Sequence, residues 1–218
     1  TVDVQGLLKS GVISRITCAR QRLVLEDARE NSGRLHTTRI PRKRSYSRVA
    51  ERALGVLKGL DIDAHPSEFN LHMPSTEMDR QKARQWMERA GLEPGRYFVL
   101  APATTTPQRH WVPERWAQLA EGLRASVGAK CVLLAGASDL PLLEQIRSHA
   151  GVDLPYSPGD LSLRESACLA RESIGIIGLD SFLLHVGLAV NTPVIALFGP
   201  TPTTRFQGEP DLTIVEKS

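Results

Sequence analysis

The sequence has little cysteine, few aromatic residues and no long apolar run. Its three cysteines, Cys18, Cys131 and Cys168, are widely separated, so they favour neither a disulfide framework nor a zinc site and indicate a reducing compartment. No apolar stretch approaches the roughly 20 residues that cross a membrane, and no cluster of carboxylates suggests a metal ion. With 218 residues, the chain could form one large domain or two smaller ones.

The net charge of +3 conceals an asymmetry between the two ends of the chain. Residues 1–60 contain 13 Lys and Arg against 5 Asp and Glu, a balance of +8, so residues 61–218 carry −5. The densest basic cluster surrounds Pro41 and consists of Arg39, Arg42, Lys43, Arg44, Arg48 and Arg52. This cluster is either a solvated helix face or a surface for an anionic partner, an acidic substrate or a membrane. Nucleic acid is disfavoured, because Tyr46 is the one aromatic residue in the cluster that could stack on bases.

Strands and helices alternate along most of the chain. Residues 1–10 are predicted to end a strand that turns into a helix at Gly6, residues 13–40 to be loop and short strand, and residues 61–78 to be a linker. The expected strands are residues 97–101, 130–135, 173–178 and 193–198, and the expected helices are residues 46–60, 79–90, 113–127, 140–150, 162–170 and 181–190. Strands rich in Val, Ile and Leu with helices between them predict an α/β fold with parallel sheets covered on both faces.

A polar loop follows the first of the regular strands. Residues 102–111 contain Thr104, Thr105 and the cation Arg109. Hydroxyls, free backbone N–H groups and one positive charge are what a phosphate group needs. The loop therefore predicts a phosphate site, and the alternative is an ordinary surface loop.

Two further strand ends carry polar residues, and the carboxyl ends of parallel strands meet at one edge of a sheet. In the turn at residues 136–139, Asp139 could accept ribose hydroxyls or could simply cap the next helix. After the strand at 173–178 come Asp180 and Ser181, with His185 one helical turn later, and the alternatives are a helix cap and a core histidine. Ser181 is not predicted to be a hydrolase nucleophile, because it lacks the Gly-x-Ser-x-Gly elbow.

These motifs resemble the lipopolysaccharide heptosyltransferases, inverting glycosyltransferases of the GT-B type that use ADP-heptose. Four segments carry the resemblance in chain order: Val-Asp-Val-Gln-Gly-Leu-Leu-Lys-Ser at 2–10, Asp-Ala-Arg-Glu at 27–30, the Thr-rich loop with Arg-His-Trp at 103–111, and Asp-Ser-Phe-Leu-Leu-His at 180–185 with Phe-Gly-Pro-Thr at 198–201. Arg109 stands where the family usually has lysine, and Phe182 stands where it has glycine.

The resemblance implies a GT-B fold of two Rossmann-like domains with parallel sheets. Residues 1–75 would be part of an acceptor-binding domain, and residues 76–218 a nucleotide-sugar donor-binding domain. The family's N-terminal strand, with the aspartate that acts as general base, would precede Thr1, and a closing segment would follow residue 218. The N-terminal domain is therefore expected to be incomplete, and the chain is expected to be a fragment that could be inactive by itself.

The implied reaction moves a heptose from ADP-heptose to an anionic, lipid-linked lipopolysaccharide inner-core acceptor, without a metal ion or cofactor. The implied catalytic residues are Arg109 and Asp180. The implied donor-binding residues are Thr104, Thr105, Arg109, Asp139, Asp180, Ser181, His185, Gly199 and Thr201. The implied acceptor-binding residues are Lys9, Arg29, Arg42 and Arg44. The expected location is the cytoplasm, with peripheral contact to the inner face of the inner membrane and no nucleic-acid partner.

Two alternatives stay open from the sequence. The first is another nucleotide-sugar enzyme on the same two-domain fold, an epimerase or a hydrolase. The second is a degenerate protein that binds a nucleotide sugar without catalysis, which Phe182 in place of glycine would favour.

Overall fold

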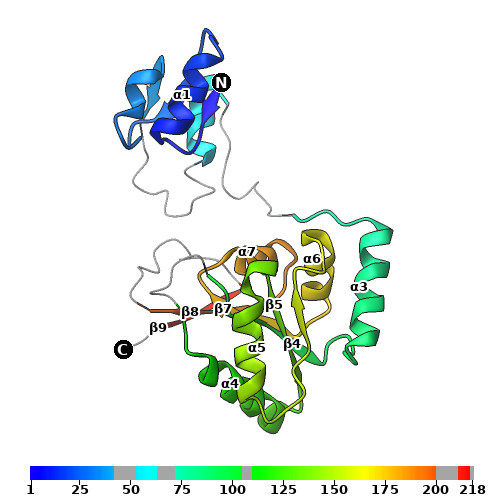
Figure 1. Ribbon diagram of the computed structural model, residues 1–218. Coiled ribbons are helices and arrows are strands. Elements are labelled where there is room, and N and C mark those ends of the chain that lie inside the picture. Colours follow the sequence, from blue (N-terminus) through cyan, green and yellow to red (C-terminus); the bar gives the residue numbers. More distant parts are fainter. Residues whose placement is uncertain (42–52, 63–71, 105–109, 200–210, 217–218) are drawn as a thin grey trace. The chain divides into compact units, whose positions relative to one another are not determined.

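The computed structural model describes residues 1–41, 53–62, 72–104, 110–199 and 211–216. Contacts within the chain divide these residues into two compact units (Figure 1). The N-terminal unit contains the described residues up to 62, and the C-terminal unit contains the described residues from 72 onward. Whether these units are an acceptor domain and a donor domain stays a prediction.

The N-terminal unit is built on a parallel sheet of order β1-β2-β3. Its elements are β1 (Val2–Asp3), α1 (Leu8–Ile16), β2 (Leu23–Leu25), η1 (Ser32–Leu35), β3 (Thr38–Ile40) and the 3-10 helix η2 (Val56–Leu60). A small core of Leu23, Leu25, Ile40 and Val56 holds the sheet against η2. The predicted turn from strand to helix at Gly6 is confirmed. The helix runs on to Ile16, into a stretch predicted as loop, because Gly11 lets α1 pack closely on η1.

The C-terminal unit is built on a six-stranded sheet of order β6-β5-β4-β7-β8-β9 in which every pair is parallel. The strands are β4 (Tyr97–Ala101), β5 (Lys130–Ala135), β6 (Tyr156–Pro158), β7 (Gly175–Leu179), β8 (Val194–Phe198) and β9 (Leu212–Glu216). The helices are α3 (Glu77–Arg89), α4 (Pro113–Val127), η5 (Ala137–Asp139), α5 (Leu140–His149), α6 (Leu163–Arg171) and α7 (Phe182–Ala189). The predicted α/β fold with parallel sheets is confirmed.

Helices cover both faces of this sheet (Figure 1). On one face, Leu100 and Leu133 pack with Trp116 of α4 and Ile146 of α5 in the main hydrophobic core. On the other face lie α6 and α7, and the hydroxyl of Tyr97 donates to the main-chain oxygen of Leu169 at 2.5 Å. Burial raises the pKa of this phenol, so Tyr97 stays a neutral donor and anchors α6 to the start of β4.

Helix α6 begins with a capping box whose glutamate, Glu165, also pairs with a lysine of α3. The Glu165 carboxylate accepts from the Ser162 main-chain N–H at 2.7 Å and lies 3.3 Å from Lys82 Nζ. The bond from Ser162 holds the pKa of Glu165 below its ordinary value of 4.5. A lowered pKa means that the charged form stabilises the fold above the unfolded-state pKa, and that this stability is lost as the pH falls through the folded-state pKa.

Glu165→Gln keeps the shape and one acceptor oxygen but removes the charge. We expect it to lower the free energy of unfolding at pH 7 by about 1 kcal/mol, and we expect the difference from the unmodified protein to disappear well below pH 4.5. Urea unfolding across this pH range measures both. Glu144→Gln, at an exposed position on α5, is the matched control and should change neither value. A difference that persists unchanged at acid pH would show that packing, and not charge, is what Glu165 contributes.

Candidate functional site

The order of strands in the C-terminal unit creates one topological switch point. The chain leaves β4 toward β5 and β6, then returns to the other side of β4 as β7 and continues to β8. In open parallel sheets, ligands bind in the crevice beyond the strand ends at such a point. The loop after β4, containing Thr104, and the loop after β7, containing Asp180 and Ser181, therefore form the candidate site.

A hydrogen bond joins these two loops directly. The Thr104 hydroxyl donates to the main-chain oxygen of Asp180 at 3.3 Å. His110 Nε2 lies 2.9 Å from the Thr104 main-chain oxygen, which closes the loop on its other side. Next to it, Trp111 packs edge-on against the fully buried Trp116, with ring centroids 5.2 Å apart. The loop is thus tied both to the neighbouring strand end and to the core.

Ser181 supplies the clearest sign of a ligand at the switch point. It is the N-cap residue of α7 and has extended backbone angles, but its side chain makes no capping bond. Its Oγ is buried and has no hydrogen-bond partner among the described residues. A buried polar atom without a partner costs about 1–3 kcal/mol. The first N–H groups of a helix also lack partners within the helix, so the start of α7 carries donors of the kind that bind anions.

Strands β7 and β4 lie very close to each other where the site begins. Gly178 pairs with Ala101 across β7 and β4, and a Cβ at Gly178 would lie 2.8 Å from Ala101 Cβ. A glycine inside a strand marks such a close approach. The residue was not predicted as part of the site, although the Gly175-Ile-Ile-Gly178 pattern within a strand is a signal that could have pointed to it.

The turn after β5 forms a neighbouring edge of the site. Asp139 Oδ2 accepts from the Gly136 main-chain N–H at 3.2 Å, so one carboxylate oxygen closes the turn. Asp139 is the N-cap residue of α5, but its side chain makes no capping bond to that helix. The loop after β6 packs closely against this turn. Gly159 has φ +90°, and a Cβ there would lie 2.8 Å from the Ala137 main-chain nitrogen. Asp160 then accepts from the Trp86 indole N–H at 2.9 Å, which fixes that loop to α3.

The other predicted donor residues are placed as follows. His185 is exposed on α7, so the alternative of a core histidine is wrong. Gly199 follows β8, is exposed, and has open space where a Cβ would be. Phe182, the first residue of α7, is 55% exposed, so its ring is not part of the core. Thr105, Arg109 and Thr201 lie outside the described residues, so their predicted roles stay predictions.

In the N-terminal unit, the loops after β1 and β2 are also joined. The Gly6 main-chain oxygen accepts from the Arg29 N–H at 2.8 Å, and Glu30 Oε2 accepts from the Leu8 N–H at 2.9 Å. Lys9, in the first turn of α1, and Arg29, in the loop after β2, are both exposed. Glu30 and Asn31 both have φ +57°, a left-handed conformation that is costly for residues other than glycine and is often found at functional loops. Arg42 and Arg44 lie outside the described residues.

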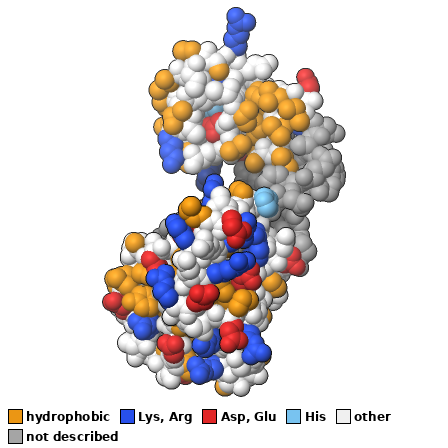
Figure 2. Space-filling model, turned by 90° about the vertical axis from the view of Figure 1, so that its right-hand side faces the viewer, with side chains coloured by type: hydrophobic (Ala, Val, Ile, Leu, Met, Phe, Trp, Pro, Cys, Tyr) orange, Lys and Arg blue, Asp and Glu red, His pale blue; other side chains and the backbone are white. Residues whose placement is uncertain are grey.

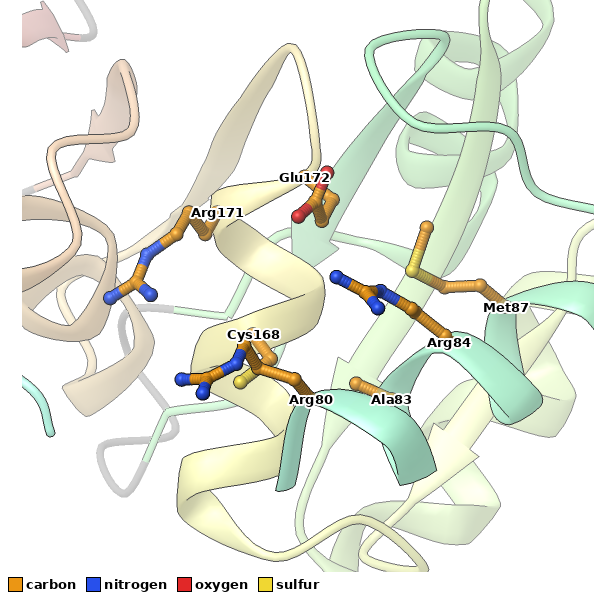
Figure 3. A pocket seen from close by; sticks show the side chains of 7 residues that line it. All are labelled: Arg80, Ala83, Arg84, Met87, Cys168, Arg171 and Glu172. Carbon is orange, nitrogen blue, oxygen red and sulfur yellow. The ribbon is translucent and has the colours of Figure 1, made fainter. Parts of the chain in front are cut away.

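A pocket lies between α3 and α6 (Figure 3). Its lining residues are Arg80, Ala83, Arg84, Met87, Cys168, Arg171 and Glu172. The Glu172 main-chain oxygen accepts from the Gly95 N–H at 2.7 Å, and these residues precede β7 and β4. The pocket is therefore at the amino ends of the strands, opposite the switch point, and does not belong to the candidate site.

Surface and composition features add little to the site. In the space-filling view, Lys, Arg, Asp and Glu side chains intermingle over the C-terminal unit (Figure 2). Within the described ranges, no helix is long and apolar enough to span a membrane, and no group of three or more His, Cys, Asp and Glu side chains could hold a metal ion.

Burial raises the pKa of the Cys131 thiol to about 12, so this cysteine is an inert core residue.

The fold and the site together define the class of this protein. A parallel sheet covered on both faces, with polar loops gathered at its switch point, is typical of Rossmann-like nucleotide-binding domains. Solved structures of similar fold include a glycosyltransferase family 9 protein from Veillonella parvula, with a TM-score of 0.78 at 20% identity over 96% of this chain and 60% of that chain. Another is the E. coli heptosyltransferase WaaC with ADP, with a TM-score of 0.69 at 23% identity over 100% of this chain and 65% of that chain. The predicted GT-B fold is confirmed.

The family model for glycosyltransferase family 9 (heptosyltransferase) matches residues 1–215, and the chain therefore belongs to this family. Lipopolysaccharide heptosyltransferase 1 of Escherichia coli K12 is 26% identical over 92% of this chain and 60% of its own length. Lipooligosaccharide heptosyltransferase 2 of Haemophilus influenzae is 34% identical over 44% of this chain and 28% of its own length. The chain thus spans less than two thirds of the length of these relatives.

Proposed function

We propose that the full-length protein is an inverting glycosyltransferase that moves a heptose from ADP-heptose to an anionic, lipid-linked lipopolysaccharide inner-core acceptor. The observation that carries the proposal is the buried Ser181 hydroxyl at the switch point, which has no hydrogen-bond partner among the described residues. Beside it, the hydrogen bond from Thr104 to Asp180 joins the loops after β4 and β7. Family membership supports the reaction class. Relatives of similar fold have been solved with ADP and with ADP-2-deoxy-2-fluoro heptose, which supports the choice of donor.

The proposed chemistry is a single displacement. A general base takes the proton of the acceptor hydroxyl as its oxygen attacks the anomeric carbon, the bond from that carbon to the diphosphate breaks, and negative charge develops on the departing ADP. Arg109, the Ser181 hydroxyl and the first N–H groups of α7 would stabilise this charge, and such preorganised donors contribute several kcal/mol in a site that excludes water. Asp180 would position the start of α7. The proposal needs no metal ion or cofactor, because protein donors neutralise the leaving group.

The remaining donor and acceptor contacts follow from the strand ends. Thr105, His185, Gly199 and Thr201 would complete the diphosphate side, and Asp139 would use its second oxygen for the ribose. Lys9 and Arg29 would bind phosphates or carboxylates of the acceptor, together with Arg42 and Arg44. The +8 balance of residues 1–60 suits an acidic, lipid-linked substrate, and peripheral contact with an anionic membrane surface would bring the enzyme to it.

Product analysis tests the proposed reaction. The full-length protein is incubated with ADP-heptose with and without a deacylated inner-core acceptor, and ADP release is measured together with the mass of the acceptor. Glycosyl transfer predicts ADP release and an acceptor heavier by one heptose when both substrates are present. ADP-heptose consumed equally without acceptor would favour a hydrolase or an epimerase. ADP binding without consumption would favour the degenerate binding protein.

Ser181→Ala separates a ligand-binding role from a structural one. We expect ADP affinity to fall about 3- to 10-fold, because one hydrogen bond to the diphosphate contributes about 1 kcal/mol. We expect the ligand-free protein to be as stable as before or slightly more stable, because the hydroxyl that is removed has no partner in the structure. Calorimetry with ADP and thermal unfolding without ligand measure the two quantities.

Ser162→Ala is the matched control for this substitution. The Ser162 hydroxyl accepts from the Glu165 N–H at 3.3 Å, so its loss should lower stability by about 1 kcal/mol and leave ADP affinity unchanged. If Ser181→Ala behaved like this control, with lower stability and unchanged affinity, the hydroxyl would be structural and the diphosphate assignment would be wrong.

A further inference from the structure

The N-terminal unit buries an acid and a histidine side by side. Asp3 is 6% exposed and the His36 side chain is 0% exposed. His36 Nε2 lies 3.2 Å from Asp3 Oδ2, although off the line of a good hydrogen bond, and His36 Nδ1 lies 2.9 Å from the Ser32 main-chain oxygen. Both ring nitrogens thus face oxygen atoms, and the donor and acceptor roles of the ring depend on its tautomer.

The Asp3 carboxylate organises the turn from β1 to α1. Its Oδ1 accepts from the Gln5 and Gly6 main-chain N–H groups, each at 2.9 Å. Its Oδ2 accepts from the Ser10 hydroxyl at 2.8 Å, and Ser10 Oγ in turn accepts from the Leu7 N–H at 3.1 Å. Burying a carboxylate is costly unless its oxygens are paired. Here the Asp3 side chain accepts hydrogen bonds from three residues of the turn, and the His36 ring lies beside its Oδ2 atom.

That turn supports Lys9 and Arg29, which are two of the exposed cations of the unit. Lys9 lies in the first turn of α1, directly after the residues that Asp3 binds. The loop of Arg29 is bonded to the same turn, because the Arg29 N–H donates to Gly6 and the Leu8 N–H donates to Glu30. Gly6 has φ +62°, and a Cβ there would lie 3.2 Å from Ala28 Cα. The two loops are therefore linked by hydrogen bonds to each other and to the turn that Asp3 binds.

We propose that Asp3 and His36 are positioning residues for the acceptor. The pair holds the turn at residues 5–8 and the loop at residues 26–31 in the one arrangement that presents Lys9 and Arg29 to the same acceptor anion. Apolar side chains of similar size would support folding equally well or better, so a buried pair of polar side chains at this place serves geometry. The substrate named here rests on the proposed function, whereas the geometric role of the pair does not.

Kinetics of His36→Gln in the full-length protein test the role in binding. We expect KM for the acceptor to rise about tenfold or more, since small displacements of binding groups have effects of this size. We expect KM for ADP-heptose and kcat at saturating acceptor to stay within about twofold. His149→Gln, at a partly exposed histidine on α5 paired with Glu114, is the control and should change none of these values. Equal changes in both KM values would overturn the proposal.

Amide hydrogen exchange tests the geometry without any activity. In His36→Gln, the amides of Leu8 and Arg29 should exchange at least about tenfold faster, and the amides of β4 and β7 should be unchanged. If His36→Gln does not fold, Asp3→Asn is used, because it keeps an oxygen for the Gln5 and Gly6 N–H groups and removes the charge that faces His36. Unchanged exchange at Leu8 and Arg29 in a folded variant overturns the proposal. A protein that transfers no sugar but shows the faster exchange overturns only the proposed function.

Discussion

Arg109→Ala is expected to lower kcat/KM for glycosyl transfer about 100- to 1,000-fold, which is the effect of removing one preorganised donor from a site where charge develops. Arg109 lies outside the described residues, and its role rests on its position in the loop between Thr104 and His110. Thr104, near the start of that loop, bonds to the main-chain oxygen of Asp180, just after β7. The proposed function assigns the charge of Arg109 to the leaving diphosphate.

Arg109→Lys is the matched variant, because the family that the sequence resembles usually has lysine here. We expect it to keep most of the activity, within about tenfold, since the charge is retained and only the forked geometry of arginine is lost. Steady-state assays with ADP-heptose and calorimetry with ADP measure both variants. If Arg109→Ala had normal turnover and normal ADP affinity, the donor site would not include this loop.

Gly178→Val is expected to destabilise the C-terminal unit by about 3 kcal/mol or more and to lower its melting temperature by roughly 10 °C. A Cβ at this position would lie 2.8 Å from Ala101 Cβ, 3.0 Å from the Ala101 main-chain oxygen and 3.1 Å from Leu184 Cδ2. The main chain of β4 cannot give way without losing its pairing to β7. ADP binding should be lost with the fold, because the switch point lies directly beyond this pair.

Gly122→Ala on α4 is the matched control. No atom lies within 4 Å of the Cβ that would be added there, and alanine favours a helix over glycine by about 0.5–1 kcal/mol. We expect the control to be slightly more stable than the unmodified protein. Urea and thermal unfolding measure both variants. A Gly178→Val protein as stable as the unmodified one would mean that β4 and β7 do not approach as closely as described.

Local signals in the sequence predicted much of the C-terminal unit. Helix α4 begins with Pro113 and ends at Gly128, which has φ +67°, and both are standard boundary residues. Strand β6 was missed, because three residues ending in Pro158 look like a loop and the strand exists through its pairing with β5. Strand β9 was missed too, since it pairs with β8 at the edge of the sheet and is mostly exposed.

The candidate site was predictable in outline but not in its contacts. Strand-end polar residues such as Thr104 and Asp180 follow buried strands, and sheet topology brings such ends together. The sequence could not reveal that the Ser181 hydroxyl is buried without a partner, or that His185 is exposed, because burial depends on how α7 lies against the sheet. The contact between Asp3 and His36 joins residues 33 positions apart through tertiary structure, and no local pattern announces it.

The switch point also sets the order in which the protein can be assembled during synthesis. Val99 of β4 pairs with Val132 of β5 on one side, but its partner on the other side is Ile176 of β7, 77 residues later. At translation rates of roughly 5–20 residues per second, the second neighbour of β4 is synthesised about 4–15 s after β4 itself. During this interval the apolar strand β4 has one unpaired edge in the nascent chain. Such an edge can bind chaperones or pair with another chain and aggregate. The donor site proposed at the switch point can therefore form only after this interval.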